Sequence, residues 1–158
     1  MFQGGQSDAA IAMAAAKSDW MFLNGGPPEK IAGIVNRVRA AADGTGRALR
    51  FALYAAPLCR PTDEEAWAEI DRRLAAVDPA LLERRRERVS GAEGMWAGKE
   101  DPLSALDTNE GYAARLIGSP DTLLARIEAF RDAGVDMMHL DVSDPLFREA
   151  VLPTVLTL

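Results

Sequence analysis

One helix and one strand can be read directly from residues 118–142, GSPDTLLARIEAFRDAGVDMMHLDV. Ser119 stands where a side chain caps a helix, Pro120 suits the first helical position, and the apolar residues that follow recur at helical spacing. Gly134 matches the left-handed residue that commonly ends a helix. Residues 135–142 then predict a strand, so this segment has the helix-then-strand order of a parallel α/β sheet.

The same alternation occupies the N-terminal third of the chain and returns at its end. The pattern predicts a strand end at 1–3, a helix at 9–17, a strand at 19–23, a helix opened by Pro27 and Pro28 and ended by Gly44 or Gly46, and a strand at 49–58. A last helix should start at Asp144 and be interrupted or ended near Pro153. Strands that alternate with helices in this way favour an α/β fold with a parallel sheet and right-handed crossovers.

The alternation breaks over residues 61–117. Two helices are predicted there, opened by Thr62 and Asp78, and residues 90–110 are rich in Gly, Asp and Asn. So long an insertion in a protein of alternating strands and helices is typical of a functional flap. We therefore expect one domain over residues 1–158, with 61–117 as a helical insertion and mobile lid before the penultimate helix.

Composition and charge exclude several classes of protein. The chain has 158 residues, 48% of them hydrophobic, with 18 Lys and Arg against 24 Asp and Glu, a net charge of −6. An acidic chain repels phosphate backbones and anionic lipid, so no nucleic-acid or membrane partner is expected. With Cys59 as the one cysteine and one histidine, neither an intrachain disulfide nor a His/Cys metal site is expected. No apolar stretch approaches the roughly 20 residues of a membrane span and nothing resembles a signal peptide, so we expect a cytoplasmic protein.

A glycine-rich turn joins the first strand end to the first helix. It consists of Gly4, Gly5, Gln6 and Ser7. Free N–H groups and the dipole at a helix N-terminus can hold an anion, and Ser7 could donate its hydroxyl to a phosphate. Ser7 could equally act only as the helix cap. The turn is no Walker loop and lacks the glycine spacing of a dinucleotide fingerprint.

Several other side chains carry two interpretations each. His139 lies in the strand 135–142, either as a general base or as a packed strand residue. Asp141 and Asp144 stand at the end of that strand, where barrel chemistry is usually found, yet Asp144 before a proline can also cap a helix. Trp96 and Tyr112 in the insertion could cover an apolar substrate or anchor the loop.

Taken in order, these segments resemble the C-terminal half of the bacterial luciferase-like flavin monooxygenases. The resemblance is closest to the dimethyl sulfone and alkanesulfonate monooxygenase branch. The matching stretches are 1–10, 18–25, 50–60 with 63–67, 94–96, 116–120 with 134–136, and 152–153. A whole (β/α)₈ barrel takes about 250 residues, so the resemblance implies the C-terminal half of a TIM barrel with about four βα units.

The resemblance also implies a chemistry. Members of the family bind reduced FMN, supplied by a flavin reductase, and activate O₂ as a flavin peroxide; this branch oxidises small organosulfur compounds such as a sulfone or an alkanesulfonate. The turn Gly4–Ser7 matches the loop that holds the FMN phosphate, which favours that interpretation of Ser7. Asn24 matches a position near the flavin, and residues 90–117 match the active-site lid.

The match departs from the alkanesulfonate enzymes at one strand. Those enzymes carry an arginine and a histidine where this chain has Tyr54 and Ala56. Without that arginine a sulfonate loses its counter-charge, so a neutral substrate such as a sulfone fits better. Tyr54 and His139 remain as the catalytic candidates.

Two other functions stay open. The chain could be a catalytically incomplete half-barrel that binds flavin or a partner and self-associates, or a deazaflavin-dependent oxidoreductase of the same superfamily. A half-barrel has two unpaired sheet edges, so we expect a homo-oligomer or pairing with the missing N-terminal half. The inward residues Ala52, Tyr54, Ala56 and His139 should then lie open to water in a monomer.

Overall fold

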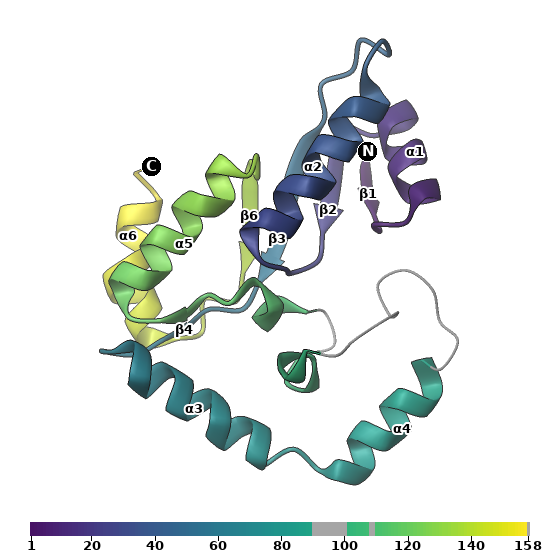
Figure 1. Cartoon of the computed structure of the whole chain (residues 1–158). Helices are drawn as coiled ribbons and strands as arrows, with labels where there is room; N and C mark the ends of the chain where they lie inside the picture. The colour runs from purple at the N-terminus through teal and green to yellow at the C-terminus, as the bar shows by residue number, and fades with distance from the viewer. Residues whose placement is uncertain (90–100, 108–109, 158) are drawn as a thin grey trace.

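Four parallel strands form the centre of the molecule, in the spatial order β1-β2-β3-β6. They are β1 (Phe2–Gly4), β2 (Trp20–Leu23), β3 (Arg50–Ala55) and β6 (Met137–Leu140). Figure 1 shows the structure, a computed structural model that describes residues 1–89, 101–107 and 110–157. All neighbouring strands are parallel, which confirms the parallel α/β sheet predicted from the alternation.

The helices between the strands begin at the predicted caps. Helix α1 (Asp8–Lys17) starts after Ser7, whose side chain accepts a hydrogen bond from the backbone N–H of Ala10. Helix α5 (Pro120–Asp132) starts in the same way after Ser119. Helix α2 (Pro28–Ala42) has proline in its first turn and ends before either of the two glycines considered. Gly134 follows α5 with a φ of 93°, the left-handed conformation predicted for it.

Helices cover one face of the sheet, which we call the covered face. Alternate strand residues point into it and are fully buried: Met21, Leu23, Phe51, Leu53 and Ala55. They pack in one core with α1, α2, α5 and the last helical segment, which comprises the π-helical turn η4 (Phe147–Val151) and α6 (Leu152–Val155). Pro153 stands in the first turn of α6, so the interruption of this helix lies at its junction with η4.

The opposite side, which we call the open face, carries the other alternate residues. Phe2 is 57% exposed and Met137 40% exposed, and His139 is exposed as predicted. The prediction that Ala52 and Ala56 lie open to water is wrong, and both are buried: Ala52 stands in register between Phe22 and Met137, and Ala56 lies against the backbone of Gly111. Tyr54, between those extremes, is half-buried.

A second small sheet, which the sequence did not predict, joins the two ends of the segment 61–117. The expected strand 49–58 is divided: β3 ends at Ala55, and a separate strand, β4 (Leu58–Cys59), pairs in parallel with β5 (Ile117–Gly118). Helix α3 (Asp63–Ala75), which begins at Thr62 as predicted, packs on this pair together with η2 (Pro102–Ala105). The described start and end of the insertion thus share a core of their own.

The middle of the insertion reaches away from the sheet. Helix α4 (Pro79–Val89) extends beyond α3, and the chain returns through η3 (Gly111–Ala114) at the carboxyl end of β3 (Figure 1). The lid predicted for 90–110 falls largely on residues 90–100 and 108–109, outside the described residues. In the described part of the chain, no helix combines the length and the apolar character needed to cross a membrane.

Candidate functional site

Most of the predicted site residues lie at one edge of the sheet. Because the four strands are parallel, their carboxyl ends meet there, and this edge carries the chemistry in barrel enzymes. The turn Gly4–Ser7 follows β1 and Asn24 follows β2, while the sheet register places Tyr54 of β3 beside His139 of β6. The sequence predictions therefore converge in space, although they come from distant parts of the chain.

The turn after β1 has the geometry of an anion site. Gly5 has a φ of 106°, and a Cβ on it would lie 3.1 Å from the Cβ of Ala10. Nothing among the described residues lies within 4 Å of a Cβ placed on Gly4, so the turn is open on that side. Ser7 Oγ accepts from the Ala10 N–H at 3.3 Å, which leaves its hydroxyl proton for another acceptor. Capping and phosphate binding by Ser7 are compatible.

The surroundings of this turn suit a phosphate as well. Asp8 would repel an anion at the start of α1, but its carboxylate pairs with the Arg37 guanidinium. Gln6 is half-buried within the turn, and Asn24 is half-buried at the end of the neighbouring strand. The residues present thus fit the phosphate of a flavin mononucleotide.

Three rings cluster on the open face near the same edge. The ring centroids of Tyr54 and His139 are 5.7 Å apart, and those of Phe22 and His139 are 6.1 Å apart. Both catalytic candidates therefore lie in contact, on a surface that offers aromatic faces and one exposed imidazole. Such a surface can pack against a flat ring or a small apolar substrate.

The Tyr54 hydroxyl is held in its protonated form. Burial raises the pKa of Tyr54, and so do the charge of Asp107 and a hydrogen bond to that carboxylate, with a further contribution from Asp141. Asp107 is a site residue without a signal in the sequence, because nothing local in the polar segment around it points to β3. Tyr54 therefore acts at neutral pH as a neutral phenol and not as a base.

Tyr112 lies in η3, one residue after Gly111. Its hydroxyl accepts a hydrogen bond from Arg73 at 2.8 Å, and its side chain packs against the core that β4, β5 and α3 share. This placement favours the anchoring interpretation of Tyr112 over contact with a substrate. Trp96, its predicted companion, lies outside the described residues.

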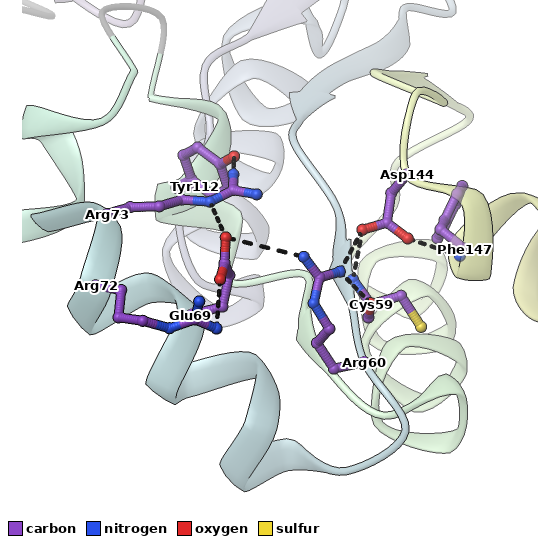
Figure 2. A network of polar contacts seen from close by, with 8 residues as sticks. All are labelled: Cys59, Arg60, Glu69, Arg72, Arg73, Tyr112, Asp144 and Phe147. Carbon is purple, nitrogen blue, oxygen red and sulfur yellow. Dashed lines mark hydrogen bonds and ion pairs between the residues drawn. The ribbon is translucent and has the colours of Figure 1, made fainter. Parts of the chain in front are cut away.

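A network of charges behind the site joins α3 to the end of β4 and the start of η4 (Figure 2). Glu69 accepts from Arg73 at 2.9 Å and pairs with Arg72 at 2.6 Å and with Arg60 at 4.0 Å. The hydrogen bond from Arg73, followed by the neighbouring arginine charges, lowers the pKa of Glu69. Arg60 in turn donates to Asp144 at 2.9 Å, so one chain of contacts holds three segments together.

Asp144 has a structural role in this network. Its Oδ1 accepts from the Phe147 N–H at 3.0 Å as a helix cap, and its Oδ2 accepts from the backbone N–H of Cys59 at 3.2 Å as well as from Arg60. Both oxygens are engaged, which favours the capping interpretation. The Cys59 thiol beside it is fully buried, and burial, followed by the Asp144 charge, raises its pKa to about 11.

No group of three or more His, Cys, Asp or Glu side chains that could hold a metal ion occurs among the residues that the structure describes. The site described above consists of a glycine-serine turn, aromatic rings and two carboxylates. Such a set of groups can bind an organic cofactor with a phosphate and can place a small substrate beside it.

Comparison with known sequences gives one family and several relatives. The family described as luciferase-like monooxygenase matches residues 1–137. An FMNH₂-dependent dimethylsulfone monooxygenase of Pseudomonas putida is 35% identical, in an alignment that covers 98% of this chain and 46% of the relative. The enzyme of the same description from Pseudomonas fluorescens (strain Pf0-1) is 33% identical with the same coverage. The chain spans about half the length of the curated relatives it matches.

Solved structures show the same fold. A riboflavin lyase determined with modified FMN and riboflavin superimposes with a TM-score of 0.73 at 22% identity, covering 99% of this chain and 42% of the lyase. DmoA from Hyphomicrobium sulfonivorans superimposes with a TM-score of 0.65 at 18% identity, covering 99% of this chain and 41% of DmoA. At these identities the likeness concerns the fold: a mixed α/β arrangement with parallel strands.

Proposed function

Because the chain belongs to the luciferase-like monooxygenase family, we propose that it is part of an FMNH₂-dependent monooxygenase that oxidises a small organosulfur compound with O₂. The observation that carries this proposal is the open glycine-serine turn at the carboxyl end of β1, which fits the FMN phosphate. Identity of 35% to a dimethylsulfone monooxygenase over nearly the whole chain supports a sulfone as the kind of substrate.

The sheet is then half of a (β/α)₈ barrel. Four parallel strands with helices on one face are half of the eight that close such a barrel. The curated relatives are about twice as long as the chain, in keeping with this interpretation. In the complete barrel the open face would line the interior, and other strands would pair with the free edges of β1 and β6.

Within this half-barrel each site residue has a defined task. Gly4, Gly5 and Ser7 would hold the FMN phosphate, with Gln6 in the same turn, and Asn24 would border the flavin from the end of β2. Reduced FMN, when bound, supplies the electrons that activate O₂, and a separate flavin reductase would deliver it. The rings of Phe22, Tyr54 and His139 exclude water and orient the substrate, and the protonated Tyr54 hydroxyl serves as a hydrogen-bonding group.

A second function is favoured by the exposure of the open face. Phe2 is 57% exposed and Met137 40% exposed, and apolar side chains left exposed on one surface mark a place where a partner can bind. A half-barrel that binds flavin or a partner, and that self-associates without turning over a substrate, would account for this exposure.

Flavin titration of the purified chain tests the proposal. FMN should bind more tightly than riboflavin, because only FMN carries the phosphate that the turn receives. Ser7→Ala should weaken FMN binding by about 0.5–1.5 kcal/mol, the value of one hydrogen bond, since backbone donors remain. Ser119→Ala is the matched control, because Ser119 caps α5 as Ser7 caps α1 and lies outside the turn.

The outcomes separate the alternatives. Riboflavin binding as tightly as FMN would contradict the phosphate assignment. Preference for a deazaflavin over FMN would support the deazaflavin-dependent class of the superfamily. FMN binding without substrate oxidation, in the presence of a flavin reductase, would support the incomplete half-barrel.

A further inference from the structure

The end of the insertion lies directly against the carboxyl ends of β2 and β3. A Cβ on Gly25 would lie 1.8 Å from the carbonyl oxygen of Glu110, and a Cβ on Gly111 would lie 2.6 Å from Tyr54 Cε1. The backbone N–H of Ala56 donates to the carbonyl of Gly111 at 3.1 Å. Since neither glycine has room for a side chain, the backbone of η3 forms one wall of the edge where the site lies.

Asp107 is bound to the start of η3 and lies beside Tyr54. Its Oδ2 accepts from the Gly111 N–H at 2.9 Å and would lie 2.6 Å from a Cβ on that residue, the same distance as Tyr54 Cε1. The Tyr54 hydroxyl hydrogen bonds to this carboxylate. A carboxylate only accepts, so Tyr54 is the donor.

This arrangement determines what Tyr54 offers to a ligand. A phenol has one proton to donate, and because Tyr54 donates it to Asp107 in a hydrogen bond, the hydroxyl presents only its lone pairs to a ligand. The carboxylates whose charges act on the hydroxyl are those of Asp107 and Asp141. A negatively charged ligand beside Tyr54 would therefore meet two carboxylates and no donated proton, whereas an uncharged ligand would meet no such repulsion.

We propose that Asp107 is a positioning residue that also sets the charge preference of the site: it binds the Tyr54 hydroxyl proton and, with Asp141, disfavours a sulfonate relative to an uncharged sulfone. The choice of these two ligands rests on the proposed function. The pairing of Asp107 with Tyr54 does not, because it follows from the contacts of η3 with β3.

The pairing can be measured without any ligand. The chain has two tyrosines, so Tyr112→Phe leaves Tyr54 as the single tyrosine whose ionisation changes the ultraviolet absorbance. In that background the absorbance midpoint should lie above the ordinary pH range of a tyrosine, and Asp107→Asn should move it down. Glu128→Gln, an exposed change on α5, is the matched control and should leave it in place.

Asp141→Asn gives a second measurement at an exposed position, where the change does not disturb the packing of η3. It should move the same midpoint down by less than Asp107→Asn, because Asp141 acts through its charge and Asp107 also through a hydrogen bond. An unchanged midpoint in the Asp107 variant, or in the Asp141 variant if the former does not fold, would overturn the proposal.

The charge preference is tested by binding dimethyl sulfone and methanesulfonate to the full chain, observed by ligand NMR. The sulfone should bind several-fold more tightly. In the double variant Asp107→Asn and Asp141→Asn, methanesulfonate should bind more tightly while the affinity for dimethyl sulfone stays the same. The ratio of the two affinities should therefore become smaller. Equal binding of the two probes to the unmodified chain would overturn the preference. If neither probe binds, the proposed substrate class and the charge preference are both wrong. The titration of Tyr54 would still test the role of Asp107.

Discussion

The two faces of the central sheet differ in the burial of their side chains. On β3, Phe51 and Leu53 point to the covered face and are fully buried, whereas Tyr54, the next residue, points to the open face and is half-buried. On β6, Met137 points to the open face and is 40% exposed. The covered face thus holds the fold together, and the open face keeps rings and carboxylates available for binding.

The largest expected effect comes from the covered face. Leu53→Ala should lower the free energy of unfolding by about 2–5 kcal/mol, because it removes buried methyl groups and leaves a cavity in the core. Met137→Ala on the open face should change it by less than about 1 kcal/mol. Urea denaturation of the two variants compares the faces directly, and equal losses would contradict the division.

A smaller effect separates two aspartates at the end of β6. Asp144→Ala removes three hydrogen bonds from a carboxylate whose side chain is 10% exposed, so we expect a loss of about 1–3 kcal/mol in the free energy of unfolding. Asp141→Ala removes one hydrogen bond at an exposed position and should cost within about 0.5 kcal/mol. If the order of these two losses were reversed, Asp144 would not be the structural residue of the pair.

Much of the covered face could be predicted from the sequence, because its signals are local. Ser7 and Ser119 are caps with proline or acidic residues just after them, and Gly134 ends a helix where an apolar strand begins. The apolar residues of α2 recur at helical spacing and are buried as that spacing requires. Each of these features is decided within a few residues along the chain.

The parts that the sequence did not predict depend on distant residues. Strands β4 and β5 have two residues each, too short to show a period, and they pair across the whole insertion. Asp107 and Tyr54 are 53 positions apart in the sequence, and the close approach of their segments needs glycine at 25 and 111. The burial of Ala52 depends on its strand neighbours Phe22 and Met137, and that of Ala56 on the backbone of η3; strand alternation contains neither.

The dependence of stability on pH tests the contact between α3 of the insertion and α5 on the covered face. Asp63 at the start of α3 accepts from the Ser119 N–H at 2.6 Å and from the Thr122 hydroxyl at 2.9 Å, and these bonds lower the pKa of Asp63. Because the folded value lies below the unfolded one, the stabilisation is present above the unfolded pKa and is lost as pH falls through the folded pKa.

Asp63→Asn should therefore be less stable than the unmodified chain at neutral pH, and the difference should shrink under acidic conditions. Denaturation midpoints measured over a series of acidic buffers give this dependence. Asp121→Asn, an exposed change in the first turn of α5, is the control and should keep the full acid sensitivity. A difference between Asp63→Asn and the unmodified chain that stays constant with pH would contradict the role given to Asp63.

The last comparison concerns self-association of the chain, which we expect to change with little effect on the free energy of unfolding. Strands β1 and β6 each have one neighbour in the sheet, and such edges recruit further strands. Phe2 on β1 and Met137 on β6 are exposed on the open face. Packing the open face against a second half-barrel would pair the free strand edges and bury the exposed apolar side chains. We therefore predict that the isolated chain self-associates at micromolar concentration. Light scattering measures this association.

Met137→Lys tests which face is responsible. A lysine at this exposed position should change the free energy of unfolding by no more than about 0.5 kcal/mol, yet it places a charge on the open face and should reduce the scattering. Met13→Lys is the matched control, since Met13 is 49% exposed on α1, on the outer side of the covering helices. An unmodified chain that stays monomeric would contradict the prediction. Equal reduction by both lysines would assign association to net charge, because only a contact through the open face distinguishes residue 137 from residue 13.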